Sequence, residues 1–202
     1  MKNISIFLAS QVAILATAVS AARPGSFILG AYQIAKPGED VIFDGDSINA
    51  SGLKFWVNKD TTTYCPNIPQ LDCTGLDSNE TLLSLSDFTT TMGMDVNVPG
   101  GQQVYIAPDG RMSFTQAHSA YIPPGSAIYG FTRDTTSSGQ TILNNEFRNW
   151  HLCPNSRIGA PEDRAYQLYA FSNGVAPLPD CIAIEIHTTE PLDQSGGVWQ
   201  YI

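Results

Sequence analysis

The sequence predicts an all-β domain, either an antiparallel β-sandwich or a closed β-barrel, with short strands and long loops. Three observations predict this fold class. No long capped stretch carries the apolar spacing of an amphipathic helix. Short apolar or alternating runs recur between turn residues. Only 14% of the residues are charged, while Gly, Pro, Ser, Thr and Asn are abundant. Three segments, at 50–56, 104–114 and 149–154, are weakly similar to one another, which leaves a β-trefoil as the alternative.

Strands are expected where the apolar or alternating runs occur. The clearest case is a hairpin in which strands 103–107 and 111–115 flank Pro108-Asp109-Gly110. Proline presets φ for a turn, aspartate caps its own backbone, and glycine takes a positive φ. The polar segment 132–140 is expected to be an exposed loop. The remaining expected strands cover residues 26–34, 41–43, 53–57, 82–85, 94–98, 128–131, 141–150, 166–171, 182–187 and 198–202.

Residues 1–22 are predicted to be a secretory signal peptide, which leaves residues 23–202 as a single all-β extracellular domain. Lys2 provides a short positive region, residues 4–19 are mostly apolar, and Ala21 and Ala22 suit a cleavage site. The apolar run is too short and too polar for a bilayer span, and no other segment is apolar for long enough. We therefore expect a secreted protein that is extracellular or located in a cell wall.

The net charge of −9 excludes two classes of partner. An acidic surface repels the phosphates of nucleic acids. It also has no attraction to anionic membranes. No nucleic-acid or membrane partner is therefore expected, and the sequence carries no signal for an oligomeric state.

Four cysteines follow the signal peptide, namely Cys65, Cys73, Cys153 and Cys181, and an even number in a secreted chain predicts two disulfides. Three connectivities are open. We expect Cys65 to pair with Cys73 and Cys153 with Cys181, because each pair lies within its own half of the chain. The alternative is a zinc site, but the chain lacks the C-x-x-C spacing and the flanking histidines of zinc motifs.

Two N-glycosylation sequons also follow the signal peptide, Asn49-Ala50-Ser51 and Asn79-Glu80-Thr81. The Asn-x-Ser/Thr pattern marks surface positions in secreted proteins. Asn49 and Asn79 are therefore predicted glycosylation sites.

One block suggests catalysis, because Gly45-Asp46-Ser47-Ile48 resembles the nucleophile block of the GDSL hydrolases. Such a serine needs a histidine to activate it and donors to hold the developing oxyanion. The family's Asp-x-x-His pattern is absent from this sequence, and so are its oxyanion blocks. We therefore expect a turn between two strands at this block and no catalytic residues. A hydrolase that uses Ser47 or a pair of carboxylates is the least favoured alternative.

The acidic segment 39–46 suggests a calcium site, but the pattern of an EF-hand fails. Phe55 stands at the position that would need a bidentate glutamate. The three histidines show no metal spacing either. No metal and no cofactor are therefore expected.

Eight aromatic residues could stack on sugar rings if they are exposed. The simpler interpretation of each is that it fills the core. The eight are Trp56, Tyr105, Tyr121, Tyr129, Trp150, Tyr166, Tyr169 and Trp199.

The block 98–125 reads VPGGQQVYIAPDGRMSFTQAHSAYIPPG. It resembles a signature block of a fungal secreted family whose members are known as phiA-type cell wall proteins or as IgE-binding proteins. Four further segments resemble that family, and the resemblance covers most of the mature chain. These segments are INASGLKFW at 48–56, Tyr64-Cys65-Pro66 with Cys73, Leu152-Cys153-Pro154, and 166–169 with Asp180-Cys181.

The resemblance implies secretion into or through the fungal cell wall, a role in the development of phialides and conidia, and allergenicity. It supplies no catalytic residues. We therefore expect a non-enzymatic cell wall or surface protein that binds a wall polysaccharide or a wall protein. The alternative is a secreted effector or allergen-like protein that recognises a host molecule.

Overall fold

The computed structural model describes residues 25–202 except 77, 147 and 193–196. The predicted signal peptide, residues 1–22, lies outside the described residues. Strands dominate the described chain, and the helical element found there is one 3-10 turn, η1 (Pro161–Asp163). The strands are β1 (Ile28–Gln33), β2 (Asp44–Ser47), β3 (Asn49–Ser51), β4 (Lys54–Val57), β5 (Thr63–Tyr64), β6 (Leu83–Ser86), β7 (Thr91–Met94), β8 (Gln102–Ile106), β9 (Met112–Phe114), β10 (Phe131–Thr135), β11 (Thr141–Asn145), β12 (Arg148–Pro154), β13 (Tyr166–Ser172), β14 (Ile182–Thr189) and β15 (Gln200–Tyr201).

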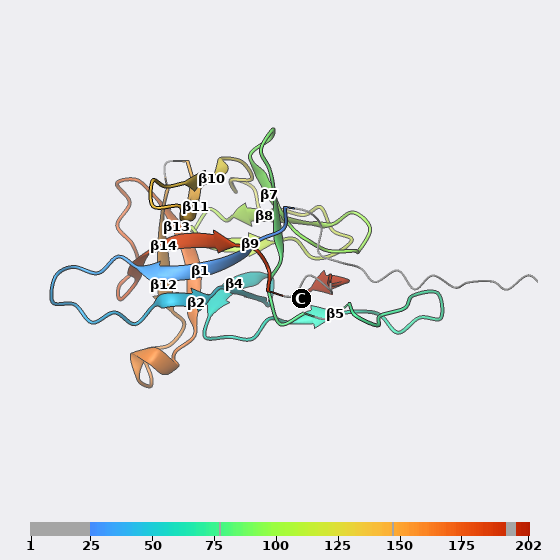
Figure 1. The fold of residues 1–202 in the computed structure, drawn as a ribbon, viewed down its shortest axis with the longest axis horizontal. Coiled ribbons are helices and arrows are strands. Elements are labelled where there is room, and N and C mark those ends of the chain that lie inside the picture. Colours follow the sequence, from blue (N-terminus) through green and yellow to red (C-terminus); the bar gives the residue numbers. More distant parts are fainter. Residues whose placement is uncertain (1–24, 77, 147, 193–196) are drawn as a thin grey trace, which may run out of the picture.

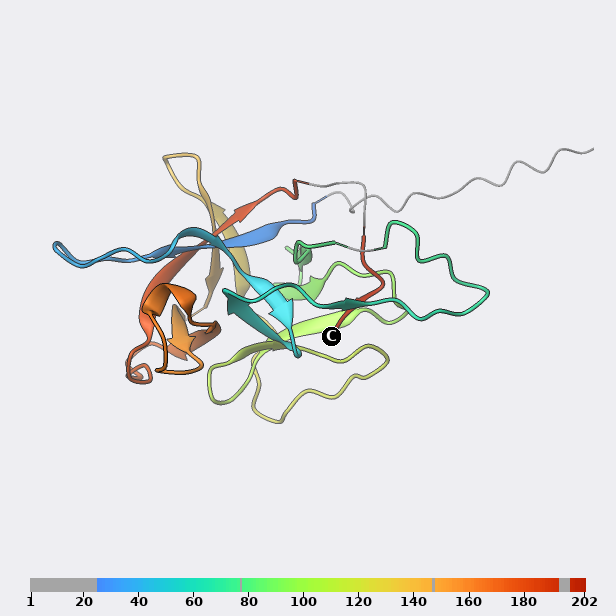
Figure 2. The same cartoon turned by 90° about the horizontal axis from the view of Figure 1, so that it is seen from below.

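Thirteen of these strands form one antiparallel sheet. Its main path runs β10-β11-β14-β12-β13-β4-β9-β8-β7-β6, with β1 joined to β14 and β2, and β3 joined to β4. Strands β5 and β15 form a separate two-stranded sheet. Figures 1 and 2 show that the loop after β1 and the loop after β5 project from opposite ends of the molecule.

The sheet curls over its core without closing into a barrel. Phe27, just before β1, exchanges two backbone hydrogen bonds with Leu83 of β6, at 3.0 and 2.9 Å. This contact is an isolated bridge and not a ladder. The fold is therefore β-sandwich-like, as one of the predicted classes requires. The closed barrel is not observed, and neither is the trefoil, whose core is also a barrel.

Alternation along the strands decides which side chains enter the core. In β13, Tyr166, Leu168 and Ala170 belong to the core cluster, whereas the residues between them face outward. Strand β4 follows the same rule, since Phe55 is fully buried in that cluster. Its side chain meets Phe114 of β9 edge to face, with ring centroids 5.5 Å apart. Such aromatic pairs add about 0.5–1.5 kcal/mol to the stabilisation from burial.

The strand expected at residues 41–43 is not observed, because β2 begins only at Asp44. Two polar segments, by contrast, form strands that were not predicted. The block at Gly45-Asp46-Ser47 is not a turn but most of β2, which pairs with β1. The segment 132–140 is not all loop, because its first four residues belong to β10. In both places polar residues form strands, since pairing with a neighbouring strand outweighs their weak intrinsic preference.

The two disulfides of the structure join Cys65 to Cys73 and Cys153 to Cys181, which is the pairing favoured from the sequence. The first closes part of the projecting loop after β5. The second links the end of β12 to the start of β14, with the Cα atoms 4.2 Å apart. No helix in the described part of the chain is long and apolar enough to cross a membrane.

The predicted hairpin of β8 and β9 is present and its turn docks on β13. Gly110, with φ of 89°, donates its N–H to the Ala107 carbonyl at 2.8 Å. Its own carbonyl accepts a hydrogen bond from the Ala170 N–H at 2.8 Å. A Cβ at this position would lie 3.2 Å from the Phe171 ring, so only glycine allows the close approach. The turn thereby fixes β9 beside β13.

Candidate functional site

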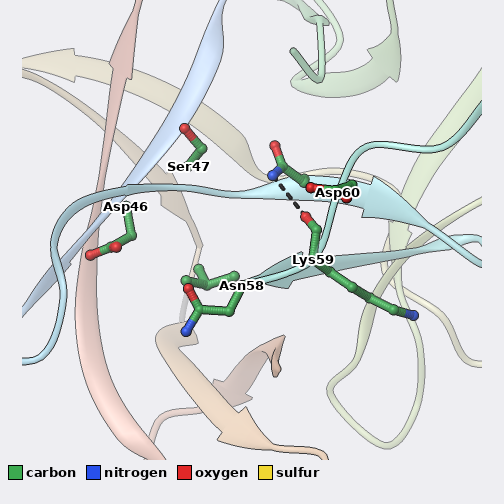
Figure 3. Close-up of a pocket in the computed structure, with 7 residues that line it drawn as sticks. Asp46, Ser47, Asn58, Lys59 and Asp60 are labelled. Carbon is green, nitrogen blue, oxygen red and sulfur yellow. Dashed lines mark hydrogen bonds between the residues drawn. The ribbon is translucent and has the colours of Figure 1, made fainter. Parts of the chain in front are cut away.

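Ser47 lines an open hollow of about 410 Å³ between β2, β3 and the end of β4. Figure 3 shows Asp46, Asn58, Lys59 and Asp60 around the same hollow. The hydrogen bond marked in that view joins the Asn49 amide to the Lys59 carbonyl at 2.8 Å. The lining residues include no histidine. The hollow is therefore a polar surface feature without the base that a serine nucleophile needs.

His187 is the histidine nearest to Ser47 in strand register, because both pair with Gly30 of β1 from opposite sides. Neighbouring strands lie about 4.8 Å apart, so the two backbones are separated by about 10 Å. The His187 ring stacks on Tyr32 with centroids 4.0 Å apart, and its Nε2 lies 3.0 Å from Oε2 of Glu185. Tyr32 and Glu185 therefore hold this ring in the sheet, and it forms no catalytic pair with Ser47.

The acidic segment 39–46 forms no metal cage. No group of three His, Cys, Asp or Glu side chains in the described chain could hold a metal ion. The Asp46 carboxylate instead accepts a hydrogen bond from the Asp44 N–H at 2.9 Å, and Glu39 accepts one from the Lys36 N–H at 3.0 Å. These carboxylates bind backbone N–H groups close to them in the sequence.

A set of aromatic side chains lies on the outward side of β8, β9, β4, β13 and β12, opposite the core. We call this set the aromatic face, and its members are Trp56, Tyr105, His151, Tyr169 and Phe171. The strand register places them on one side. Trp56 pairs with Gln167, two residues before Tyr169, and Tyr169 pairs with His151. At the Tyr169 position the turn between β8 and β9 pairs directly with β13, through the bridge between Arg111 and Tyr169.

Its centre is a run of stacked rings. Tyr169 and Phe171 lie nearly parallel, 14° apart, with centroids 5.3 Å apart. His151 meets Phe171 edge to face at 5.4 Å. Burial raises the pKa of Tyr169 and of Tyr105 above the ordinary tyrosine value, so both phenols stay neutral at physiological pH. Neutral phenols next to flat rings are groups that bind sugars by stacking and hydrogen bonding.

A charged pair adjoins these rings. The backbone of Arg111 forms an isolated β-bridge with that of Tyr169. The Arg111 side chain donates from Nε to Oδ2 of Asp109 at 2.6 Å. Partial burial acts to raise the pKa of Asp109, but the hydrogen bonds from Arg111 lower it below the ordinary carboxyl value. The Asp109 hydrogen bond likewise raises the pKa of Arg111. The aromatic face is therefore flanked by one fixed donor and one fixed acceptor.

The structure separates the aromatic residues singled out in the sequence. Trp150 and Tyr166 belong to the core cluster, and Trp199 packs against it. Tyr121 and Tyr129 are 72% and 60% exposed. Trp56, Tyr105 and Tyr169 lie on the aromatic face, where the two tyrosines are partly exposed and Trp56 is buried, with 5% of its surface exposed.

Sequence reasoning missed Phe171, Arg111 and Gln167. The only sign of them in the sequence was the alternation of side chains along a strand, which puts residues 167, 169 and 171 of β13 on the side opposite the core residues. The residues on each side of β13 include large apolar side chains, so alternation alone could not tell which side faces outward.

The two predicted glycosylation sites lie beside one another. Asn49 and Asn79 line the same small hollow, and the Ala50 N–H of the first sequon donates to Thr81 Oγ1 of the second at 2.7 Å. Asn79 is exposed, whereas Asn49 is partly buried. Asn49 also uses its Nδ2 to bind the Lys59 carbonyl. The two sequons therefore differ in accessibility.

Comparison with known proteins gave two matches. A family model described as PhiA-like secreted protein matches residues 34–202. The chain is also 33% identical over 170 residues to an uncharacterized secreted protein of the fungus Arthroderma benhamiae, and the match covers 82% of each chain. No solved structure matches. The aromatic face lies wholly within the region matched by the family model.

Proposed function

Because the chain belongs to the PhiA-like secreted protein family, we propose that it is a non-enzymatic fungal cell wall protein that binds wall glycan through the aromatic face. The family and the Arthroderma benhamiae relative are both described as secreted, which agrees with an extracellular site of action. The resemblance to phiA-type proteins supports a role in phialide and conidium development. Wall polysaccharide is the proposed partner.

The observation that carries the glycan proposal is the partly exposed ring of Tyr169, which stacks on the buried Phe171 on the outward side of the sheet. Sugar rings present apolar C–H faces that pack on aromatic rings, and hydroxyls that need donors and acceptors nearby. Arg111 and Asp109 supply both beside Tyr169.

We propose a non-enzymatic function because Ser47 has no histidine beside it that could activate it for hydrolysis. Its hollow contains no histidine, and His187 is engaged by Tyr32 and Glu185. We expect Ser47→Ala to leave glycan binding and stability unchanged.

Removal of Tyr169 tests the glycan proposal. We expect Tyr169→Ala to weaken retention of the mature protein on insoluble wall glycan by about fivefold, since one lost stacking contact is worth about 1 kcal/mol. The double variant Tyr105→Ala/Tyr169→Ala should weaken it by about 25-fold if the two contacts act independently. Depletion of protein from solution by chitin and by β-glucan particles measures the affinity.

The matched control is Tyr64→Ala, because Tyr64 is 50% exposed and lies in the separate two-stranded sheet. It should bind as well as the natural protein. Retention of the natural protein on neither glycan would contradict the proposal. If that protein is also free in culture fluid and causes a response in host tissue, recognition of a host molecule becomes the better function.

We also propose that Asn79 carries the N-glycan of the mature protein and that Asn49 is modified less. Asn79 is exposed, while the Asn49 amide is partly buried and bound to the Lys59 carbonyl. In protein secreted by a fungal host, Asn79→Gln should remove most of the mass released by N-glycosidase, and Asn49→Gln little of it. Equal losses from both variants would contradict this difference.

A further inference from the structure

A second hollow lies beside β8, and most of its wall comes from the block 98–125. Its volume is about 490 Å³, which is larger than the hollow at Ser47 and within the range of about 300–1,000 Å³ that small-molecule sites occupy. Eight of the nine residues that line it fall in that block, and the ninth is Ile128. The block that resembles the family's signature therefore folds around a hollow of ligand size.

His118 lines this hollow in an unusual backbone conformation. Its φ is 60°, in the left-handed region that residues other than glycine seldom adopt. Strain of this kind persists only where the surrounding structure holds it, as the buried Ala117 does here, and it gathers at ligand sites. His118 is exposed, and its ring makes no hydrogen bond within the described chain. An imidazole N–H is therefore available to a ligand.

The rest of the lining combines apolar surface with a second donor and lacks negative charge. Ile122 and Ile128 are both partly exposed. Ser119 Oγ accepts the Tyr121 N–H at 3.2 Å, and its own O–H has no acceptor in the part of the chain that the structure describes. No Asp or Glu is among the lining residues, although the chain carries 19 of them. An apolar ligand with a negatively charged acceptor matches this lining.

We propose that the hollow binds an aliphatic carboxylic acid, with the carboxylate at His118 and Ser119 and the hydrocarbon chain on Ile122 and Ile128. The carboxylate oxygens accept hydrogen bonds from the imidazole N–H and the serine O–H, and such charge-assisted bonds are about twice as strong as neutral ones. The hydrocarbon chain leaves water for the isoleucine side chains. This site is separate from glycan binding, because none of its lining residues belongs to the aromatic face.

The pair of variants His118→Asn and His118→Asp tests the carboxylate position. Asparagine and aspartate have the same shape and both tolerate the left-handed conformation, so the two variants differ in charge alone. Calorimetric titrations of the mature protein with octanoate and with octan-1-ol measure the affinities. We expect His118→Asp to bind octanoate about tenfold more weakly than His118→Asn, because two negative charges then meet near the surface. Both variants should bind octan-1-ol equally.

The variant Ala120→Trp tests the location, because Ala120 is an exposed residue of the lining and the indole would fill the hollow. It should abolish octanoate binding. The matched control is Ala176→Trp, at an exposed position between β13 and β14, which should bind octanoate as the natural protein does. Tyr169→Ala should also leave octanoate binding unchanged, since Tyr169 lies on the aromatic face.

Three results would overturn the proposal. The first is a natural protein that binds neither octanoate nor octan-1-ol. The second is equal octanoate affinity in His118→Asn and His118→Asp, which would remove the carboxylate from His118. The third is octanoate binding that survives in Ala120→Trp, which would place the ligand elsewhere on the molecule.

Discussion

Replacing both Cys153 and Cys181 by serine should lower the free energy of unfolding by about 3.5 kcal/mol. The two residues are 28 positions apart, and the loop they close contains all of β13. Without the bond, the unfolded chain gains the conformational freedom that closure of this loop removes. A loss of this size is a large part of the 5–15 kcal/mol that stabilises an ordinary domain.

The comparison variant replaces Cys65 and Cys73, which are only eight positions apart. Loop closure predicts a smaller loss of about 2.5 kcal/mol. The measured loss should be smaller still if the projecting loop opens without the sheet, because local opening leaves the rest of the fold intact. Denaturant unfolding of both variants measures the two free energies.

Loss of the Cys153–Cys181 bond should weaken glycan binding more than loss of the Cys65–Cys73 bond. The Cys153–Cys181 bond joins β14 to β12, and β12 pairs with β13, the strand that carries Tyr169 and Phe171. The Cys65–Cys73 bond lies in a loop outside the aromatic face. Equal losses of stability, or equal losses of glycan binding, in the two variants would contradict the larger role given to Cys153–Cys181.

The strands with clear apolar alternation were predictable, and the polar strands were not. Residues 53–57, 103–107, 166–171 and 182–187 all contain or overlap observed strands. Strand β2 was missed because Asp44, Gly45 and Asp46 are turn residues by local preference. They form a strand because β1 offers a ladder at Gly30 and because the Tyr32 ring packs over Gly45.

The aromatic face shows a second limit of sequence reasoning. The sequence identified Trp56, Tyr105 and Tyr169 as candidates, but these residues come from three separate strands. Their proximity depends on the order β8-β9-β4-β13, in which β4 lies far in the sequence from both of its neighbours, β9 and β13. Local patterns carry no information on that order, so the set could not be assembled before the fold was known.

The buried side chain of Gln102 offers a test of how the C-terminal strand is held. Gln102 is 3% exposed, and its Nε2 donates to the carbonyls of Thr115 and Tyr201, each at 2.9 Å. Its Oε1 accepts the Tyr201 N–H, also at 2.9 Å. One side chain thus satisfies three backbone groups at the junction of β8 and β15.

Gln102→Ala should lower the free energy of unfolding by at least about 3 kcal/mol, because each buried backbone group left unpaired costs about 1–3 kcal/mol. The control is Gln103→Ala. Gln103 also donates two hydrogen bonds, to the carbonyls of Met92 and Val104, but it is only partly buried. Water can replace its amide, so the expected loss is about 1 kcal/mol. Similar losses in the two variants would contradict the role given to Gln102.

Gln102→Glu separates hydrogen bonding from shape, because the carboxylate keeps the shape but faces two carbonyl oxygens where the amide donated. Burial and these oxygens disfavour the charged form, so the folded state raises the pKa of the new carboxyl above its unfolded value of about 4.3. The protonated carboxyl can donate to one carbonyl, and this contribution is fully present below the unfolded pKa. It is lost as the pH rises through the folded pKa, so the deficit relative to the natural protein should be larger at neutral pH than at pH 4. Denaturant unfolding at both pH values measures that change, and a deficit independent of pH would show that the carboxyl reaches solvent.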